Sequence, residues 1–348
     1  MTNTMTNYFL DSLVPQTSLH GIESGRDFSK ARNNEKLLPW QVTGLADGEG
    51  GFNCFIENTG KGLTGHTVKL EFKVTQKTHS SGILYELQEF FGCGSVVIDN
   101  RKTDTKKYHI TALSSILEKI IPHFESYPCL TSKFLNFIDW KQIALIMSKK
   151  EHLTIKGIEE IKELISKMNK NRSFEDKYNH CKTYLGLTVL PNGEWKTNYN
   201  LPANWVQTYL TGESMFYTYL AEKKSRGKVY QGCDSSLELG QNNHDVAVLI
   251  SLKQFFNGGY IKPKYKYDNI DECIKSRSVN RYVLRNTDSI IQFVDEYPML
   301  TRKQLDYLDW KRIVELKISN AHKTEEGLAL IKDIISKVNS RRDSTLTD

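Results

Sequence analysis

The segment Phe124-Glu-Ser-Tyr-Pro-Cys-Leu-Thr-Ser-Lys133 has a near copy later in the same chain, Val294-Asp-Glu-Tyr-Pro-Met-Leu-Thr-Arg-Lys303, at an offset of 170 residues. One such match could arise by chance between two helices. Three further pairs of segments occur in the same order: Asp139–Ile143 with Asp309–Ile313, Ile161–Asn169 with Ile331–Asn339, and Phe90-Phe91-Gly92 with Phe255-Phe256-Asn257. Four collinear matches over more than 100 residues indicate two copies of one fold, and a repeat this long indicates two domains rather than a solenoid.

Each copy has the pattern of a helix, two strands, a helix, two more strands and a helical tail. This order predicts an α+β fold of two pseudo-symmetric αββαββα domains. The predicted tail helices are Ile110–Phe124, Lys133–Met147 and Ile155–Asn169 in copy one, and Asp288–Val294, Arg302–Leu316 and Glu325–Asn339 in copy two. The predicted domains are 37–169 and 203–340, with a poorly ordered leader 1–36, a linker 170–202 and a tail 341–348. Pro191-Asn192-Gly193 is a turn signal within the linker.

The composition is that of an ordinary globular protein that can bind a polyanion. The 348 residues suffice for two medium domains, and the formal charge of +6 is compatible with nucleic acid without proving it. The longest apolar runs, such as Ile143–Met147, are too short to span a bilayer, which argues against a membrane partner. The six cysteines form no Cys-x-x-Cys pair, which argues against zinc and favours buried free thiols. The leader resembles neither a secretory signal nor an Arg-rich transit peptide.

Each copy opens with a related helix-to-strand corner. The first is Leu38-Pro-Trp-Gln-Val-Thr-Gly-Leu-Ala-Asp-Gly-Glu-Gly-Gly-Phe52, and the second is Ala203-Asn-Trp-Val-Gln-Thr-Tyr-Leu-Thr-Gly-Glu-Ser-Met-Phe216. Pro39 suits the first turn of a helix, and the glycines suit its end. Gly44 and Gly48 lie one turn apart, and Thr208 and Gly212 are the equivalent small residues. This spacing would let the two helices approach each other closely.

A glutamate ends each of these helices. The helix dipole is negative there, so Glu49 and Glu213 are unfavourable for stability. Either motif alone is better explained as a plain helix–strand corner with a solvated glutamate. The same residue at the head of both copies instead favours a site that needs negative potential, such as a divalent cation site.

The segment Thr43-Gly-Leu-Ala-Asp-Gly-Glu-Gly-Gly-Phe52 resembles the LAGLIDADG motif, which ends in a metal-binding Asp or Glu. The Tyr-Pro-x-Leu-Thr corners and Lys150-Glu-His-Leu-Thr-Ile-Lys-Gly157 resemble the fungal mitochondrial, intron-encoded branch of that homing endonuclease family. The resemblance covers roughly Leu37 to Asn339. The second motif is degenerate, with Thr208, Thr211 and Ser214 replacing a glycine, an acid and a glycine, but it keeps Glu213.

The resemblance implies that the two motif helices pack together and place Glu49 and Glu213 over the scissile phosphates. Two or more Mg²⁺ ions, ligated by these acids and the carbonyls of Gly48 and Gly212, would activate water and stabilise the leaving 3′ oxygen in an in-line displacement. It further implies that Mn²⁺ substitutes for Mg²⁺, that Ca²⁺ supports binding without efficient cleavage, and that cutting leaves short 3′ overhangs. Gln76 and Gln241 resemble residues that position water, and Lys133 and Lys303 fall near the family's active-site lysine, although a solvated helix residue is an equal alternative for either lysine.

The strands indicate a DNA-binding surface independently of the family. Leu70, Phe72 and Val74 alternate with polar residues along one strand, so one face is apolar and the other basic. Basic faces in both copies favour a ribbon surface that reads major-groove edges and phosphates. The candidate DNA-binding residues are Asn53, Phe55, Lys69, Glu71, Lys73, Thr75, Lys77, Tyr217, Tyr219, Lys223, Lys228, Lys262, Lys264, Lys266, Arg281 and Arg285. Asn53 and Phe55 correspond to Tyr217 and Tyr219, so the half-surfaces differ and the target should be asymmetric.

These observations predict a saddle of two antiparallel sheets and a monomeric, Mg²⁺-dependent, site-specific DNA endonuclease. It would act on a duplex of roughly two helical turns, and the resemblance implies that it acts in the mitochondrion. Two alternatives stay open. One is a maturase that binds its host intron RNA and assists splicing, and the other is a DNA-binding relative that no longer cuts. Retention of both acids favours the endonuclease.

Overall fold

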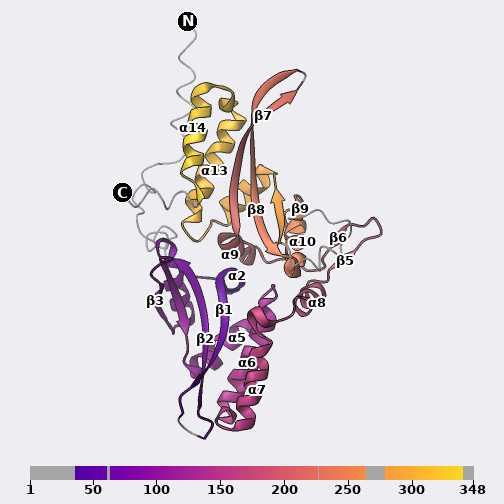
Figure 1. Cartoon of the computed structure of the whole chain (residues 1–348). Helices are drawn as coiled ribbons and strands as arrows, with labels where there is room; N and C mark the ends of the chain where they lie inside the picture. Colours follow the sequence, from indigo (N-terminus) through magenta and orange to yellow (C-terminus); the bar gives the residue numbers. More distant parts are fainter. Residues whose placement is uncertain (1–35, 61–62, 226, 264–278, 340–348) are drawn as a thin grey trace.

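The computed structural model describes residues 36–60, 63–225, 227–263 and 279–339. Figure 1 shows two halves, each with a sheet backed by helices, meeting at two central helices. These central helices are α2 (Pro39–Glu49) and α9 (Ala203–Glu213), which open the two halves. Both end on the glutamate that the sequence singles out, and in each case the first strand follows directly.

The first half has a four-stranded antiparallel sheet in the order β1-β2-β4-β3. Its elements after α2 are β1 (Gly50–Asn58), β2 (His66–Lys77), α3 (Gly82–Phe91), β3 (Ser95–Asn100), β4 (Thr105–Ile110), α4 (Leu113–Ser115), η2 (Ile116–Ile120), α5 (Ile121–Ser126), α6 (Lys133–Ser148) and α7 (Ile155–Ser166).

The second half repeats this plan, with a sheet in the order β7-β8-β10-β9. Its elements after α9 are β7 (Ser214–Ser225), β8 (Lys228–Asn242), α10 (Val246–Phe255), β9 (Tyr260–Pro263), β10 (Val279–Leu284), α12 (Thr287–Glu296), α13 (Lys303–Ile318) and α14 (Glu325–Ser336). The predicted αββαββα architecture is confirmed in both halves.

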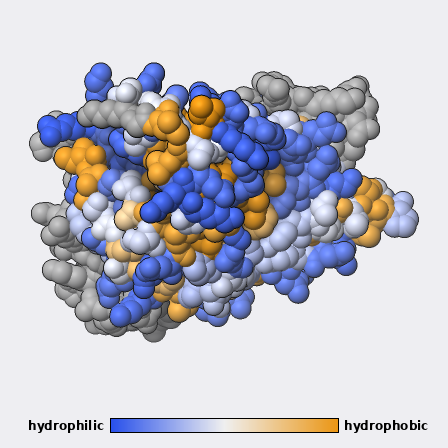
Figure 2. All heavy atoms as spheres, turned by 90° about the horizontal axis from the view of Figure 1, so that it is seen from below, coloured by the Kyte–Doolittle hydropathy of each residue, from blue (hydrophilic) through white to orange (hydrophobic). Residues whose placement is uncertain are grey.

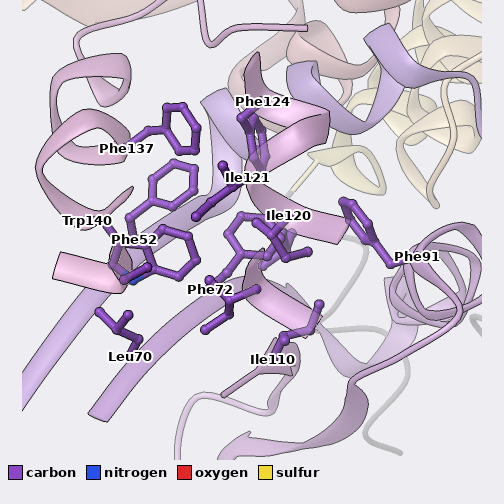
Figure 3. Packing of buried hydrophobic residues seen from close by; sticks show 14 of the residues in the cluster. Phe52, Leu70, Phe72, Phe91, Ile110, Ile120, Ile121, Phe124, Phe137 and Trp140 are labelled. Atoms are coloured by element: carbon purple, nitrogen blue, oxygen red, sulfur yellow. The ribbon is translucent and has the colours of Figure 1, made fainter. Parts of the chain in front are cut away.

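The core of the first half lies between its sheet and the tail helices. The predicted alternation along β2 is confirmed, because Leu70, Phe72 and Val74 are all buried. Figure 3 shows Phe52 and Phe72 surrounded by side chains from the helices, including Phe124 and Trp140. One face of the sheet is thereby covered, which leaves the opposite face for the polar residues.

Equivalent contacts hold the tail helices in both halves. Trp140 Nε1 donates to the carbonyl of Asn53 at 3.0 Å, and Trp310 Nε1 donates to that of Tyr217 at 3.2 Å. Asn169 Nδ2 donates to the carbonyl of Phe52 at 3.1 Å, as Asn339 Nδ2 does to that of Phe216 at 3.0 Å. The duplication therefore extends from the sequence to individual hydrogen bonds.

The segment between the halves is ordered around its own small elements. It contains η4 (Asn169–Asn171), α8 (Phe174–Tyr184) and the hairpin of β5 (Thr188–Val189) and β6 (Trp195–Lys196). The turn signal in the linker lies in that hairpin, where Gly193 has φ 79° and donates its N–H to the carbonyl of Leu190 at 2.8 Å.

The first predicted tail helix differs from the structure in its start and in its continuity. Ile110 ends β4, paired with Phe72, and the helix begins only at Leu113. Apolar periodicity alone cannot separate the buried end of a strand from the first turn of a helix. The helix is also interrupted by the π-turn η2. Pro122 has no N–H to donate and its ring would clash with the carbonyl of Glu118, which accounts for the widened turn.

Other expectations concern the surface and the cysteines. Figure 2 shows a largely hydrophilic face with its hydrophobic residues in separate groups. Among the described residues, no helix combines the length and apolar character needed to cross a bilayer. Cys54, Cys93, Cys129, Cys181 and Cys233 are free thiols. Cys273, the predicted leader 1–36 apart from Lys36, and the tail 341–348 lie outside the described residues.

Candidate active site

Helices α2 and α9 pack directly against each other through their small residues. A Cβ added to Gly44 would lie 2.1 Å from Thr208 Oγ1 and 2.5 Å from the carbonyl oxygen of Trp205. Because real Cβ atoms do not approach backbone so closely, Gly44 is required for this contact. Nearer the helix ends, Gly48 and Gly212 face each other. The close approach that the spacing of Gly44 and Gly48 predicts is confirmed.

Buried polar side chains cross the same interface. Gln41 Nε2 donates to Gln207 Oε1 at 2.7 Å. Trp205 Nε1 donates to Asp47 Oδ2 at 2.8 Å. Asp47 also accepts from the backbone N–H of Leu130 at 2.8 Å and from Thr131 Oγ1 at 2.6 Å, so its buried carboxylate is well partnered. Burial raises the pKa of Asp47, and these hydrogen bonds oppose the rise.

The two terminal glutamates lie side by side at the end of the helix pair. A Cβ on Gly212 would be 3.4 Å from Glu49 Cγ, and one on Gly48 would be 3.8 Å from Glu213 Cγ. Each acid therefore lies against the last glycine of the opposite helix. Desolvation, followed by the charge of Glu49, raises the pKa of Glu213 to about 7. The pKa of Glu49 is raised by desolvation as well, against the opposing charges of Lys133 and Lys303.

Both candidate lysines point into this cluster. Lys133, the first residue of α6, donates from Nζ to the carbonyls of Ala46 at 3.0 Å and Gly48 at 2.9 Å. Lys303, the first residue of α13, donates from Nζ to the carbonyl of Ser214. Desolvation lowers the pKa of each lysine, and the two glutamates oppose that shift. Their positions exclude the alternative of solvated helix residues.

The two candidate glutamines are equivalent in register but not in contact. Gln241 Nε2 donates to Glu213 Oε2 at 3.0 Å. Each glutamine lies two residues after the strand residue that pairs with the position following the acid. In the first half that strand residue is Val74, which pairs with Gly50. In the second half it is Leu239, which pairs with Ser214. Within the described hydrogen bonds, none joins Gln76 to Glu49.

The available donors fit a magnesium site better than a zinc site. Among the residues that the structure describes, no group of three or more His, Cys, Asp or Glu side chains is arranged so that it could hold a metal ion. The donors at the corner are two carboxylates and the carbonyls at two helix ends. Mg²⁺ is commonly bound by one or two carboxylates together with water and substrate phosphates. A cavity of about 500 Å³ opens here, lined in part by Gly48, Lys133, Glu213 and Gln241.

The outer face of the first sheet has seven of the sixteen predicted DNA-binding residues, and several of these are already paired. Lys69 pairs with Glu57 at 2.7 Å, Lys73 with Asp99 at 3.8 Å, and Lys77 Nζ donates to the carbonyl of Thr103 at 2.8 Å. Asn53, Phe55 and Thr75 lie on the same sheet, and Phe55 is exposed.

Glu71 departs from the expectation of an exposed strand face. It is only 7% exposed, because Lys107 at 2.7 Å and His109 at 3.2 Å close over its carboxylate. Burial would raise the pKa of Glu71, but the hydrogen bond and charge of Lys107 outweigh it, and the pKa is lowered. Lys107, on β4, was not recognised from the sequence.

The outer face of the second sheet is aromatic as well as basic. Tyr217 and Tyr219 are exposed, in positions equivalent to Asn53 and Phe55. Lys223 pairs with Asp234 at 2.7 Å and Arg281 with Glu238 at 3.0 Å. Lys262 pairs with Arg281 in register across β9 and β10, and the guanidinium of Arg285 lies 5.7 Å from the ring centre of Tyr260. Lys264, Lys266 and the side chain of Lys228 lie outside the described residues.

Comparison with known proteins agrees with this geometry. The profile of the LAGLIDADG endonuclease family matches residues 42–144 and 209–314. The chain is 27% identical over 317 residues to the probable intron-encoded endonuclease 3 of Neurospora crassa, which covers 90% of this chain and 56% of that protein. It is 26% identical over 352 residues to the probable intron-encoded endonuclease 2 of the same fungus, covering 94% of this chain and 73% of that protein.

Solved structures give the same result. I-SmaMI bound to an uncleaved DNA target with calcium ions superimposes with a TM-score of 0.71 at 26% identity, over 87% of this chain and 99% of that one. The I-LtrWI LAGLIDADG homing endonuclease bound to target DNA superimposes with a TM-score of 0.71 at 25% identity. The match covers 87% of this chain and 98% of that one. The chain therefore belongs to the LAGLIDADG endonuclease family. It spans about half the length of the first of its curated relatives, at 56%.

Proposed function

We propose that this protein is a site-specific DNA homing endonuclease that cuts both strands within a long asymmetric target and leaves short 3′ overhangs. The observation that favours this function most is the pairing of Glu49 and Glu213 at the touching ends of α2 and α9. The similar structures of I-SmaMI and I-LtrWI are complexes with DNA targets, which supports duplex DNA as the partner here.

In this proposal Glu49 and Glu213, with the carbonyls of Gly48 and Gly212, hold Mg²⁺, and Mn²⁺ could replace it. The bound cations supply Lewis-acid stabilisation of charge on the phosphate and a more acidic water. Gln241 orients the carboxylate of Glu213 through its amide, and Gln76 is the equivalent residue at the other corner. Ca²⁺ should permit binding but not efficient cutting, since its looser coordination orients the attacking water poorly.

Lys133 has a further part in this mechanism. Its ammonium group donates to the Gly48 carbonyl, one of the proposed cation ligands. Beside these ligands, the Lys133 ammonium group would stabilise the negative charge that develops on the scissile phosphate in the transition state. Lys303 would serve the other strand in the same way.

The outer faces of the two sheets form the proposed DNA saddle, with base-reading residues drawn from the candidates above. The two faces differ in sequence, because Asn53 and Phe55 of the first half correspond to Tyr217 and Tyr219 of the second. This difference supports an asymmetric target. A single chain supplies both corners, so we propose a monomer. Several curated relatives are named as intron-encoded endonucleases, and three are named for ND4 or cox1, which supports our assignment to the mitochondrion.

The second candidate function is an RNA maturase that assists splicing of its host intron, because a basic saddle can also bind structured RNA. A duplex selected from a randomised library by binding in Ca²⁺ provides a probe that does not presuppose cleavage. Linearisation in Mg²⁺ of a plasmid with this duplex supports the endonuclease. Accelerated splicing of host-intron RNA without cutting would support the maturase, and binding without either activity would indicate an inactive relative.

A further inference from the structure

The turn that precedes α6 is held by two buried carboxylates from different halves of the protein. Asp47, in α2, accepts hydrogen bonds from the backbone N–H groups of Leu130 at 2.8 Å and Thr131 at 3.3 Å. Asp245, at the start of α10 in the second half, accepts from the backbone N–H of Ser132 at 2.8 Å and from Ser132 Oγ at 3.2 Å. Three successive N–H groups just before α6 therefore donate to buried carboxyl oxygens, an arrangement that suits the helix dipole.

Asp245 also joins the linker to this turn. The thiol of Cys181, in α8, donates to Asp245 Oδ1 at 3.0 Å, and His244 Nε2 lies 3.2 Å from Oδ2. Asp245 is 6% exposed. Burial would raise the pKa of this carboxyl, but His244, Cys181 and Ser132 outweigh that effect and lower it. One ionised carboxylate thus connects the first half, the linker and the second half.

The residue that follows this turn is Lys133, whose ammonium group lies in the proposed active site. Ser132 and Lys133 are adjacent in the chain, so any movement of the Ser132 backbone moves the base of the lysine side chain. A displacement of about 1 Å at a catalytic group can reduce a rate about a hundredfold.

At the other corner, the positions equivalent to the two aspartates hold neutral residues. Thr211 replaces Asp47, and its hydroxyl accepts from the backbone N–H of Leu300 at a long 3.4 Å. Ser80, at the end of η1 (Thr78–Ser80), occupies the position equivalent to Asp245, and its hydroxyl contacts His79 Nδ1 at 2.9 Å. The turn before Lys133 therefore donates to two carboxyl groups, whereas the turn before Lys303 has a neutral hydroxyl acceptor in place of the first.

We propose that Asp245 is a positioning residue for Lys133, and that it makes the two strand cuts unequal by holding one active-site lysine more firmly than the other. The proposal rests on the endonuclease function above. It predicts that wild-type protein cuts the strand served by Lys133 first, so that a nicked intermediate with one defined break accumulates.

The test uses the full-length protein and the duplex selected by binding in Ca²⁺, with a different fluorophore on the 5′ end of each strand. Single-turnover cleavage in Mg²⁺ is followed on denaturing gels, which give a rate for each strand. Lys133→Met identifies the strand served by Lys133. Asp245→Asn should slow that strand about tenfold or more and leave the other within about twofold. Ser132→Ala, which removes only one donor, should give a smaller loss on the same strand.

Two control variants separate positioning from a general loss of structure. Asp295→Asn removes a carboxylate of α12 that accepts from Tyr307 and Lys311 rather than from the turn before Lys133, and it should leave the rate of the strand served by Lys133 unchanged. Thr211→Val removes the acceptor at the other corner and should slow the opposite strand. Affinity in Ca²⁺ should stay within about threefold for all of these variants.

The outcomes are distinguishable. Equal slowing of both strands by Asp245→Asn, or no slowing of either, in a wild type that cuts would overturn the positioning role alone. Equal loss of both strands in Lys133→Met would overturn it as well. A wild-type protein that binds the duplex but cuts neither strand would overturn the proposed function together with this inference.

Discussion

Gly44 of α2 lies so close to Trp205 of α9 that a side chain at Gly44 would overlap the tryptophan's carbonyl oxygen, with only 2.5 Å between that oxygen and a Cβ. This contact sets the separation of the two helices, and the helices set the separation of their terminal glutamates. The geometry of the proposed site therefore depends on a residue one turn away that takes no part in its chemistry.

Gly44→Ala should destabilise the protein by about 1–3 kcal/mol, because overpacking a close helix contact forces backbone shifts. It should also reduce cleavage more than it reduces DNA affinity. Chemical denaturation measures the first effect. Gly258→Ala is the matched control, since a Cβ there meets nothing nearer than 3.6 Å. If Gly44→Ala unfolds at the wild-type denaturant concentration, the close contact does not fix the helix pair.

His123 should make stability depend on pH in the mildly acidic range. It is buried among aromatic rings, with Nε2 3.3 Å from Thr43 Oγ1, and desolvation lowers its pKa from 6.5 to about 4. The unfolded chain therefore takes up the proton first as pH falls. The contribution of neutral His123 to the unfolding free energy is therefore complete above about pH 6.5 and is lost as pH falls to 4. The total loss of unfolding free energy is roughly 3 kcal/mol.

Denaturant titrations of wild type and His123→Phe between pH 4 and 8 measure this dependence. The unfolding free energy of wild type minus that of His123→Phe should be constant above about pH 7. It should decrease as pH falls below about 6.5, because only the wild type loses stability through His123. A difference that stays constant down to pH 4 would mean that His123 is protonated in the folded protein.

Glu71 should limit non-specific DNA binding by neutralising neighbouring cations. Its carboxylate accepts from Lys107 and His109 on the face proposed to contact DNA. Glu71→Gln frees these groups for phosphates, so affinity for random duplex should rise. The slope of log affinity against log salt concentration should steepen by up to about one, the equivalent of one more released counterion. Discrimination between target and random duplex should fall.

Fluorescence anisotropy in Ca²⁺ at several salt concentrations measures both effects. Glu125→Gln is the control for net charge, because Glu125 pairs with Lys141 on the helical side of the sheet. Equal gains in non-specific affinity for the two variants would attribute the effect to overall charge rather than to the Glu71 cluster.

The repeated motifs of the sequence were sufficient to predict the architecture, and together with the family resemblance they indicated the residues of the proposed site. Glu49 and Glu213 could be found because both copies keep them, and Lys133 because the family resemblance places it near the active-site lysine of that family. Asp245 could not, because its partner Ser132 lies 113 residues away and neither residue belongs to a periodic pattern. The burial of Glu71 was missed for the same reason, since Lys107 joins it from another strand.

The predicted helix start at Ile110 is wrong because the apolar pattern of a strand runs directly into that of a helix there. Ile110 satisfies the apolar pattern of the following helix but pairs with Phe72 in the sheet. The π-turn before Pro122 arises from a steric conflict that hydropathy does not express. Gln76 and Gln241 had equivalent patterns, yet only Gln241 contacts its glutamate in the described structure. Such differences between the copies depend on side-chain geometry.

The central claim is that both corners form one cutting site, and Glu213→Gln tests it most directly. The substitution keeps the size of the side chain but removes the charge proposed to hold Mg²⁺.

Supercoiled plasmid with the selected duplex is incubated with protein in Mg²⁺ and resolved into supercoiled, nicked and linear forms. Glu296→Gln, the same change on α12, controls for the substitution itself and should linearise the plasmid. The account predicts that Glu213→Gln forms no linear product while binding the duplex in Ca²⁺ at least as tightly as wild type, because a carboxylate facing phosphates repels them. Full linearisation by Glu213→Gln would contradict the account.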